Sequence, residues 1–154
     1  MNNFKKLNNI TGWLVFLIAT IVYLVTMEKS ASLWDCGEFI SAAYKLEVVH
    51  APGAPFFLML GRIFSLFAAD ATQVAIMVNS MSALSSSFTI LFLFWTITAF
   101  GKKIYSKDGK IEQSKTIAVL GAGVVGSLAY TFSDSFWFSA VEGEVYALSS
   151  FFTA

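Results

Sequence analysis

The chain has 154 residues, of which 56% are hydrophobic and only 13% are charged. Soluble domains carry about 25% charged residues, and a mean hydropathy of +0.69 cannot be buried inside a globule of this size. The net charge is zero and no basic cluster alternates with aromatic residues, which argues against a nucleic-acid partner. The single cysteine, Cys36, excludes a disulfide framework and a Cys-rich metal site, and leaves packing or one reactive thiol as its role. The composition predicts a membrane protein.

Residues 10–27 form an uncharged run close to the ~20 residues that a helix needs to cross a bilayer. Lys5 and Lys6 precede this run, and Trp13 and Tyr23 lie near its two ends, as is typical of interfacial anchors. A cleavable signal peptide is the alternative, but its apolar region is normally shorter, and no small-residue cleavage site follows here. We therefore predict a first transmembrane span over residues 10–27.

The next segment is polar and then briefly apolar. Residues 28–55 carry seven Asp, Glu, Lys and His side chains and must reach water, so we expect a loop with helical pieces. Pro52 and Pro55, the only prolines, bracket a glycine and an alanine, which predicts a rigid corner. Residues 56–69 are apolar but few, and they include Arg62, which suits an interfacial or re-entrant helix better than a span.

Residues 71–100 form a second uncharged run, which is long enough to tilt in a bilayer. Asp70 and Thr72 can cap its start. Its first half combines Asn79 with serines, alanines and methionines, a composition typical of helices that pack against other helices in membranes. We expect this second span to face protein and not lipid.

The last third of the chain repeats this pattern. Residues 101–116 form a basic loop, with a turn predicted through Asp108 and Gly109. Residues 116–133 are a third uncharged run, and an apolar run that opens at Val145 is unfinished where the chain stops. We therefore expect the N-terminal part of a larger all-α protein, with multi-pass transmembrane helices and a helical first outer loop.

Charge counting predicts the orientation of this domain. Seven of the ten Lys and Arg residues lie before the first span or between the second and third, which assigns those segments to the cytoplasm. Eight of the ten Asp and Glu residues lie in the opposite segments. We therefore predict a cytoplasmic N terminus, with residues 28–70 and 134–144 on the non-cytoplasmic side of a bacterial inner membrane or an endoplasmic reticulum membrane.

The first outer loop contains the most suggestive polar residues. Asp35 and Glu38 are three residues apart, a spacing that places both on one face of a helix. They can be surface acids, or one can be a general base whose pKa is raised because Trp34 and Phe39 partly desolvate it. His50 is the only imidazole in the chain. A lone histidine is usually structural, but Asp35, Glu38 and His50 could together ligate a divalent cation. The corner at residues 52–55 can fold the second half of the loop back over the first, so we expect Asp35 and His50 to converge on one cavity at the non-cytoplasmic surface.

Three further patterns admit two interpretations each. Arg62 is a functional candidate if it lies at membrane depth, or a side chain that reaches back to the headgroups. Glu142 and Glu144 would point to nearly opposite sides of a regular helix, so we expect at most one to face a given cavity and the other to be solvated. Residues 121–126 fit the G-x-G-x-x-G dinucleotide pattern, but glycines in an uncharged run are typical of close helix packing.

Three stretches resemble a known family. Residues 32–44 (SLWDCGEFISAAY) and 48–55 (VVHAPGAP) resemble the opening motifs of a membrane protein O-mannosyltransferase-like family, long labelled a domain of unknown function. Residues 136–148 (FWFSAVEGEVYAL) resemble its second characteristic stretch. The family belongs to the GT-C class of glycosyltransferases, which use polyprenyl-phosphate sugars. Ala51 stands where the proline corner of the class usually has its first proline, which weakens the expected stiffness of that corner.

The resemblance implies that Asp35 is the catalytic base, with Glu38, His50 and Glu144 in contact with substrate. It also leaves Arg62 as the available cation for the departing phosphate. The implied reaction moves a sugar, with mannose as the expected one, from a polyprenyl-phosphate donor to a Ser or Thr hydroxyl of a polypeptide acceptor. The implied partners are therefore the polyprenyl-phosphate sugar donor, the polypeptide acceptor and the membrane lipid. No cofactor is certain, and a divalent cation is the candidate.

Two other classes of function stay open from the residues alone. A transporter or channel fragment would line a midplane path with Arg62 and Asn79, because intramembrane polar residues often mark solute routes. A noncatalytic assembly subunit would need neither a cavity nor ordered acids. A transferase instead predicts a cavity at the outer surface, below the loop that contains Asp35.

Overall fold

The computed structural model describes residues 2–106 and 111–154, and this part of the chain is all-helical. Its elements are α1 (Asn2–Thr26), α2 (Cys36–Lys45), α3 (Pro55–Ser65), the 3₁₀ helix η1 (Ala71–Gln73), α4 (Val74–Tyr105), α5 (Gln113–Thr131), α6 (Asp134–Val141) and α7 (Val145–Thr153). The predicted all-α class is confirmed. The turn expected through Asp108 and Gly109 lies outside the described residues.

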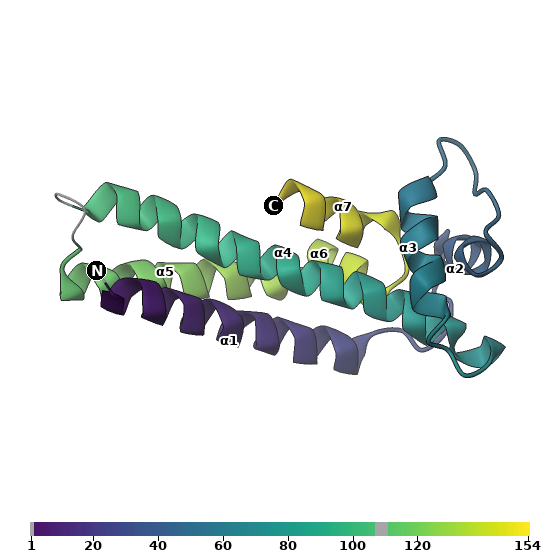
Figure 1. The fold of residues 1–154 in the computed structure, drawn as a ribbon, viewed down its shortest axis with the longest axis horizontal. Coiled ribbons are helices and arrows are strands. Elements are labelled where there is room, and N and C mark those ends of the chain that lie inside the picture. The colour runs from purple at the N-terminus through teal and green to yellow at the C-terminus, as the bar shows by residue number, and fades with distance from the viewer. Residues whose placement is uncertain (1, 107–110) are drawn as a thin grey trace.

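Three long helices form the body of the molecule. Figure 1 shows α1, α4 and α5 side by side, with α2 and α3 gathered at one end of this bundle. The start of α1, the end of α4 and the start of α5 lie at the other end, and α7 runs along α4. The first outer loop with α2 and α3 therefore lies at the end of the bundle opposite the described part of the basic segments.

Two helical segments are long and apolar enough to cross a membrane, judged by length and composition: Asn3–Thr26 and Ala71–Tyr105. The second includes η1, whose start is capped as expected, because Asp70 Oδ1 accepts a hydrogen bond of 2.8 Å from the backbone N–H of Thr72. Helices α5 and α6 meet the same test only as a pair, and they are bent by 67°. A third crossing at residues 116–133 stays a prediction.

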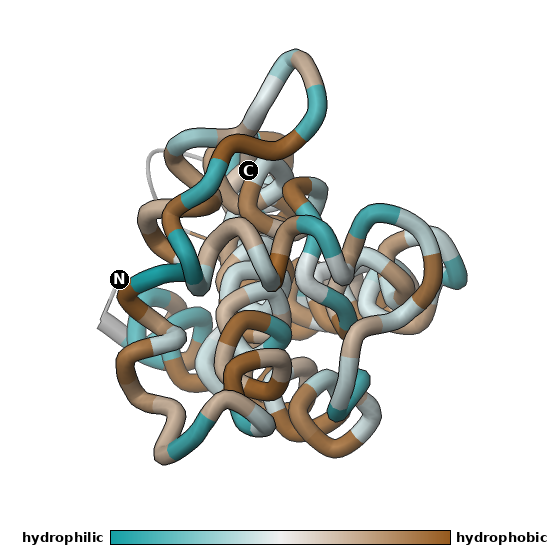
Figure 2. The backbone as a smooth tube through the Cα atoms, turned by 90° about the vertical axis from the view of Figure 1, so that its right-hand side faces the viewer, coloured by the Kyte–Doolittle hydropathy of each residue, from teal (hydrophilic) through white to brown (hydrophobic). Residues whose placement is uncertain are grey.

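Helix α1 separates two environments. Val15, Ala19 and Tyr23 are buried on one face, in a cluster that also includes residues of α4 and α6. Many large apolar side chains of α1 are instead exposed: Leu7, Ile10, Trp13, Leu14, Leu17, Ile18, Ile21, Leu24 and Val25. Figure 2 looks along the bundle from the α2–α3 end, and hydrophobic segments reach the outer edge of the molecule. Water-soluble monomers rarely expose so large an apolar patch, whereas lipid favours it.

Helix α4 is the central element, and its small residues permit close packing. Ser82, Ala83 and Ser86 are almost fully buried, which confirms that this helix faces protein. The glycine pattern at residues 121–126 lies within α5 and not after a strand. A Cβ atom at Gly123 would lie only 2.7 Å from Thr98 Cγ2 of α4. Gly123 and Gly126, which would meet Ile97 of α4, therefore belong to a helix interface, as the packing interpretation predicted, whereas Gly121 faces open space.

Candidate active site

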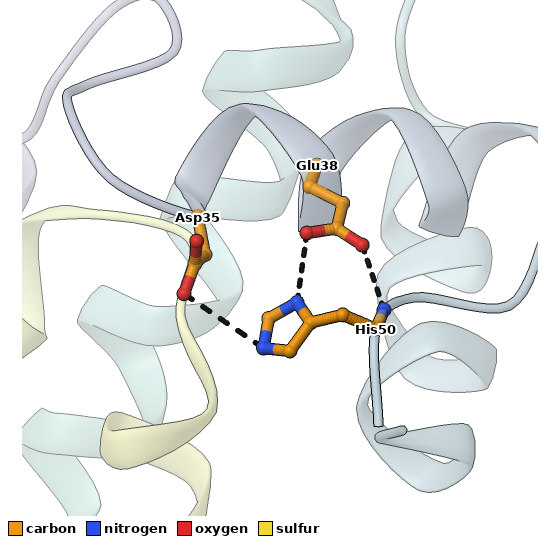
Figure 3. Close-up of side chains that lie close together, drawn as sticks. All are labelled: Asp35, Glu38 and His50. Atoms are coloured by element: carbon orange, nitrogen blue, oxygen red, sulfur yellow. Dashed lines mark hydrogen bonds and ion pairs between the residues drawn. The ribbon is translucent and has the colours of Figure 1, made fainter. Parts of the chain in front are cut away.

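His50 bridges the two acids of the first outer loop. Asp35 immediately precedes α2, and Glu38 lies in the first turn of that helix. The backbone N–H of His50 donates to Glu38 Oε1, and His50 Nδ1 contacts Glu38 Oε2, both at 2.8 Å. His50 Nε2 points the other way and lies 3.9 Å from Asp35 Oδ2 (Figure 3). The predicted convergence of Asp35 and His50 is confirmed.

The backbone between α2 and α3 explains how His50 returns to α2. Helix α2 is capped by Leu46, which adopts a left-handed conformation with φ of 56° and donates its N–H to the carbonyl of Ala42. After His50 the chain turns again, because the N–H of Gly53, at φ of 76°, donates to the His50 carbonyl at 2.8 Å. Pro55 then occupies the first turn of α3, where its fixed φ suits a helix start. The predicted corner is thus a tight turn that joins two helices.

The ion pair between Glu38 and His50 orients the imidazole and adds little stability. Hydrogen bonds from the His50 ring and backbone lower the pKa of Glu38. The Glu38 carboxylate in turn raises the pKa of His50, and the charge of Asp35 contributes less. Because all three side chains are exposed, solvent screens the interaction. The main effect of the ion pair is to orient the imidazole ring so that Nε2 faces Asp35.

A cavity of about 650 Å³ lies beside Asp35, where the connection from α1 to α2 meets the connection from α6 to α7. Four carboxylates line it: Glu28, Asp35, Glu142 and Glu144. A smaller cavity of about 180 Å³ adjoins the proline corner, and it is lined by Asp35, Glu144 and His50 among others. Asp35 and Glu144 line both cavities, so the structure brings three predicted site residues to one place.

The expectation that at most one of Glu142 and Glu144 faces a given cavity is wrong. Helix α6 ends at Val141 and α7 begins at Val145, so both glutamates lie in extended backbone. Alternate side chains of an extended segment share a face, whereas on a helix they diverge. Gly143 between them was the signal that regular helix is interrupted here.

Glu144 is electrostatically distinct from the other acids in this cavity. Partial burial raises the pKa of its carboxyl, and the nearby charges of Glu142 and Asp35 raise it further. A carboxyl of this kind keeps its proton to a higher pH than an ordinary glutamate.

Asn79 of α4 anchors the loop that leads to Asp35, a role that sequence analysis missed. Its Nδ2 group donates to the carbonyls of Glu28 and Ser30 at 2.8 and 3.2 Å. The N–H of Glu28 donates to the carbonyl of Val141 at 2.9 Å, which ties the same loop to the end of α6. The available signal was one amide near the start of a helix whose other polar residues are mostly hydroxyls.

Arg62 does not join this site. Its Nη1 donates to the carbonyl of Tyr44 at 2.7 Å, and its guanidinium lies 5.4 Å from the centre of the Tyr44 ring. This carbonyl is one of the last in α2, where helix carbonyls have no partner within the helix and attract cations. Arg62 thus holds α3 against α2. A solute path shared by Arg62 and Asn79 has no support, because Arg62 is bonded to a carbonyl of α2 and Asn79 to two carbonyls of the first outer loop.

Asp35, Glu38 and His50 offer one ligand atom each, and these atoms lie within 4.8 Å of one another. Carboxylate oxygen and imidazole nitrogen are ligands that several divalent cations accept. With Glu38 on Nδ1, the histidine would present Nε2 to an ion, as metal-ligating histidines commonly do. The residues present are therefore compatible with a divalent cation.

Comparison with known proteins gives a consistent result. The model of the Protein O-mannosyl-transferase TMEM260 N-terminal domain matches residues 35–154. The chain is 29% identical to the Protein O-mannosyl-transferase tmem260 of Dictyostelium discoideum over 142 residues, 92% of this chain and 15% of that protein. It is 30% identical to the Protein O-mannosyl-transferase TMEM260 of Mus musculus over 139 residues, 90% of this chain and 17% of that protein. The chain thus spans less than a fifth of these relatives, and no solved structure matches it.

Proposed function

The chain belongs to the Protein O-mannosyl-transferase TMEM260 N-terminal domain family, and we propose that its protein transfers mannose from a polyprenyl-phosphate carrier to Ser or Thr hydroxyls of polypeptides. The names of the two relatives support protein O-mannosylation. The polyprenyl-phosphate donor follows from the resemblance to the GT-C class. One observation carries the proposal: the Asp35 carboxylate lines both cavities at the end of the bundle.

Asp35 is the catalytic base of the proposed reaction. As the acceptor oxygen forms its bond to the anomeric carbon, the Asp35 carboxylate takes the hydroxyl proton. The bond between the anomeric carbon and the phosphate oxygen breaks, and polyprenyl phosphate leaves with the bonding electrons. The carboxylate is accessible from the cavity, as a base that meets an incoming hydroxyl must be.

The neighbouring side chains position this base and the substrate. Glu38 fixes the ring of His50, and His50 Nε2 lies close enough to Asp35 to orient its carboxylate through a small movement or a water molecule. Glu144 lines the same cavity as Asp35 and can form a hydrogen bond with a sugar hydroxyl. In this proposal Asp35 removes the proton and Glu144 helps to bind the sugar.

The proposal is tested by Asp35→Asn in the full-length protein. The amide keeps the shape of the side chain and removes the base, so transfer from polyprenyl-phosphate mannose to an acceptor peptide should fall about 10²-fold or more. Glu38→Gln should reduce transfer less, because Glu38 acts through His50. Transfer within a few-fold of wild type in the Asp35→Asn protein would exclude Asp35 as the base, and equal losses in both variants would indicate a shared metal site.

We also propose that this end of the bundle lies on the non-cytoplasmic side and that the N terminus is cytoplasmic. Single cysteines at Ser30 and Ser106 lie near opposite ends of the bundle, in a Cys36→Ala background. A membrane-impermeant thiol reagent applied from outside should label only the cysteine at position 30. Labelling of both from the same side would contradict the proposed topology.

A further inference from the structure

Three exposed aromatic side chains stand around the larger cavity. Trp34 precedes α2, Phe138 lies on α6 and Tyr146 lies on α7, so they come from three separate segments of the chain. Trp34 is 91% exposed, and Phe138 and Tyr146 are each 60% exposed. All three line the same space of about 650 Å³ as the four carboxylates, which is within the usual size of small-molecule sites.

The conformation of Trp34 is not explained by folding. Its φ of 62° places a bulky residue in the left-handed region, which such residues rarely adopt. Trp34 is almost fully exposed, so burial of its indole does little to offset the unfavourable backbone conformation. Unfavourable backbone conformations of this kind gather at functional sites, where the surroundings hold a side chain in a required position. Here Trp34 lines the cavity, next to Asp35.

The combination of aromatic and acidic side chains fits one chemical class of ligand. A sugar ring presents hydroxyl groups around its edge and C–H groups on its faces. Carboxylates accept hydrogen bonds from hydroxyls, and the electron-rich face of an aromatic ring attracts polarised C–H groups. Within the described part of the chain, no Lys or Arg lines this cavity. Four carboxylates without a cation disfavour a phosphate inside it, because like charges repel.

We propose that this cavity is the subsite for the neutral sugar ring of the donor, with Trp34 as the ring's stacking platform. The inference rests on the proposed function, and it divides the donor into two parts. The sugar ring lies among the carboxylates with its anomeric carbon toward Asp35. The phosphate and the polyprenyl chain extend out of the carboxylate-lined space.

Equilibrium binding to the full-length protein tests this division without requiring turnover. Two probes are compared: a short-chain polyprenyl-phosphate mannose, and the same polyprenyl phosphate without the sugar. Trp34→Ala should weaken binding of the mannose-bearing probe about tenfold and leave binding of the sugar-free probe unchanged. Trp34→Tyr should keep most of the affinity, because it retains an aromatic face. Val48→Ala is the matched control, since Val48 is 88% exposed in the same outer loop and does not line either cavity beside Asp35.

The other outcomes overturn the inference in identifiable ways. Equal weakening of both probes by Trp34→Ala would make Trp34 a contact for lipid. No weakening of either would remove it from the donor site, and equal affinity of wild type for both probes would remove the sugar subsite itself. The wild-type protein could instead bind the mannose-bearing probe selectively, lose that selectivity in Trp34→Ala, and yet transfer no sugar. That result would support the sugar subsite and refute the proposed transfer reaction.

Discussion

The helical bundle and the outer site are held together in different ways. In the bundle, Phe94 and Ile90 of α4 are fully buried, and the hydroxyl of Tyr23 on α1 donates to the Thr131 carbonyl on α5 at 3.0 Å. In the outer site, the ionisable side chains around His50 are exposed and a few polar bonds fix them. The bundle thus depends on many packed atoms, whereas the site depends on a few hydrogen bonds. Substitutions should therefore separate stability from activity.

The two regions meet at α4. Asn79 and Gly143 are in close contact, since a Cβ atom added to Gly143 would lie 2.9 Å from Asn79 Oδ1. Through its hydrogen bonds to the carbonyls of Glu28 and Ser30, Asn79 joins the first outer loop to the central helix. The difference between the two regions can be tested by substituting one residue in the bundle interior, one at this junction and one in the site.

The largest effect on stability is expected at Gly123 in the bundle. An added methyl group in Gly123→Ala would meet Thr98 Cγ2 at 2.7 Å and Phe94 Cε2 at 2.8 Å, so α4 and α5 must separate. Overpacking of this kind costs about 1–3 kcal/mol. Denaturant titration of the full-length protein in detergent should show a loss of that size in the free energy of unfolding.

Gly121→Ala in the same helix is the control for helix propensity. A Cβ atom there would meet nothing within 4 Å, and alanine favours a helix over glycine by up to about 1 kcal/mol. The variant should be unchanged or slightly stabilised. If both substitutions lowered stability equally, packing between α4 and α5 would not be the cause.

The bundle could be predicted from the sequence because its signals are repeated along the chain. The uncharged run at residues 71–100 predicted a long helix, and its serines and alanines predicted that the helix faces protein. The glycines at residues 121–126 favoured close packing over a nucleotide site. Each conclusion drew on many residues, so no single side chain could reverse it.

The site could be predicted only where a local motif or a resemblance named its parts. The first outer loop contained Asp35, Glu38 and the proline corner, which together predicted that His50 returns to the acids. Glu142 was misassigned because helical geometry was assumed where the backbone is extended. Arg62 was expected at the phosphate because its partner, a backbone carbonyl, leaves no trace in the sequence. Contacts between distant segments were the information that local patterns lacked.

An intermediate effect is expected at the junction. Asn79→Ala removes both hydrogen bonds to the first outer loop and leaves two carbonyls without their donor, a loss of about 1–3 kcal/mol. The loss of stability should be confined to the first outer loop. Hydrogen exchange measured by mass spectrometry should increase in residues 28–35 and stay constant in the second half of α4. Ser80→Ala should change neither region, because the Ser80 hydroxyl bonds mainly within α4, to the carbonyl of Ile76 at 2.6 Å. Equal exchange in Asn79→Ala and wild type would show that the loop is held by other contacts.

The smallest effect is expected in the site, where it is a change of titration and not of stability. The pKa of His50 is raised first by its hydrogen bond to Glu38 and least by the charge of Asp35. A raised histidine pKa means that the interaction with imidazolium is complete below the ordinary value of about 6.5 and fades as pH rises through the higher folded value. Glu38→Gln should therefore return the pKa of His50 toward its ordinary value, and Asp35→Asn should lower it less. Nuclear magnetic resonance titration of labelled histidine, with the signal assigned by His50→Gln, measures both. A larger decrease in Asp35→Asn than in Glu38→Gln would mean that Asp35 is the principal partner of the imidazole, and the assignment of Glu38 as the group that orients His50 would have to be reversed.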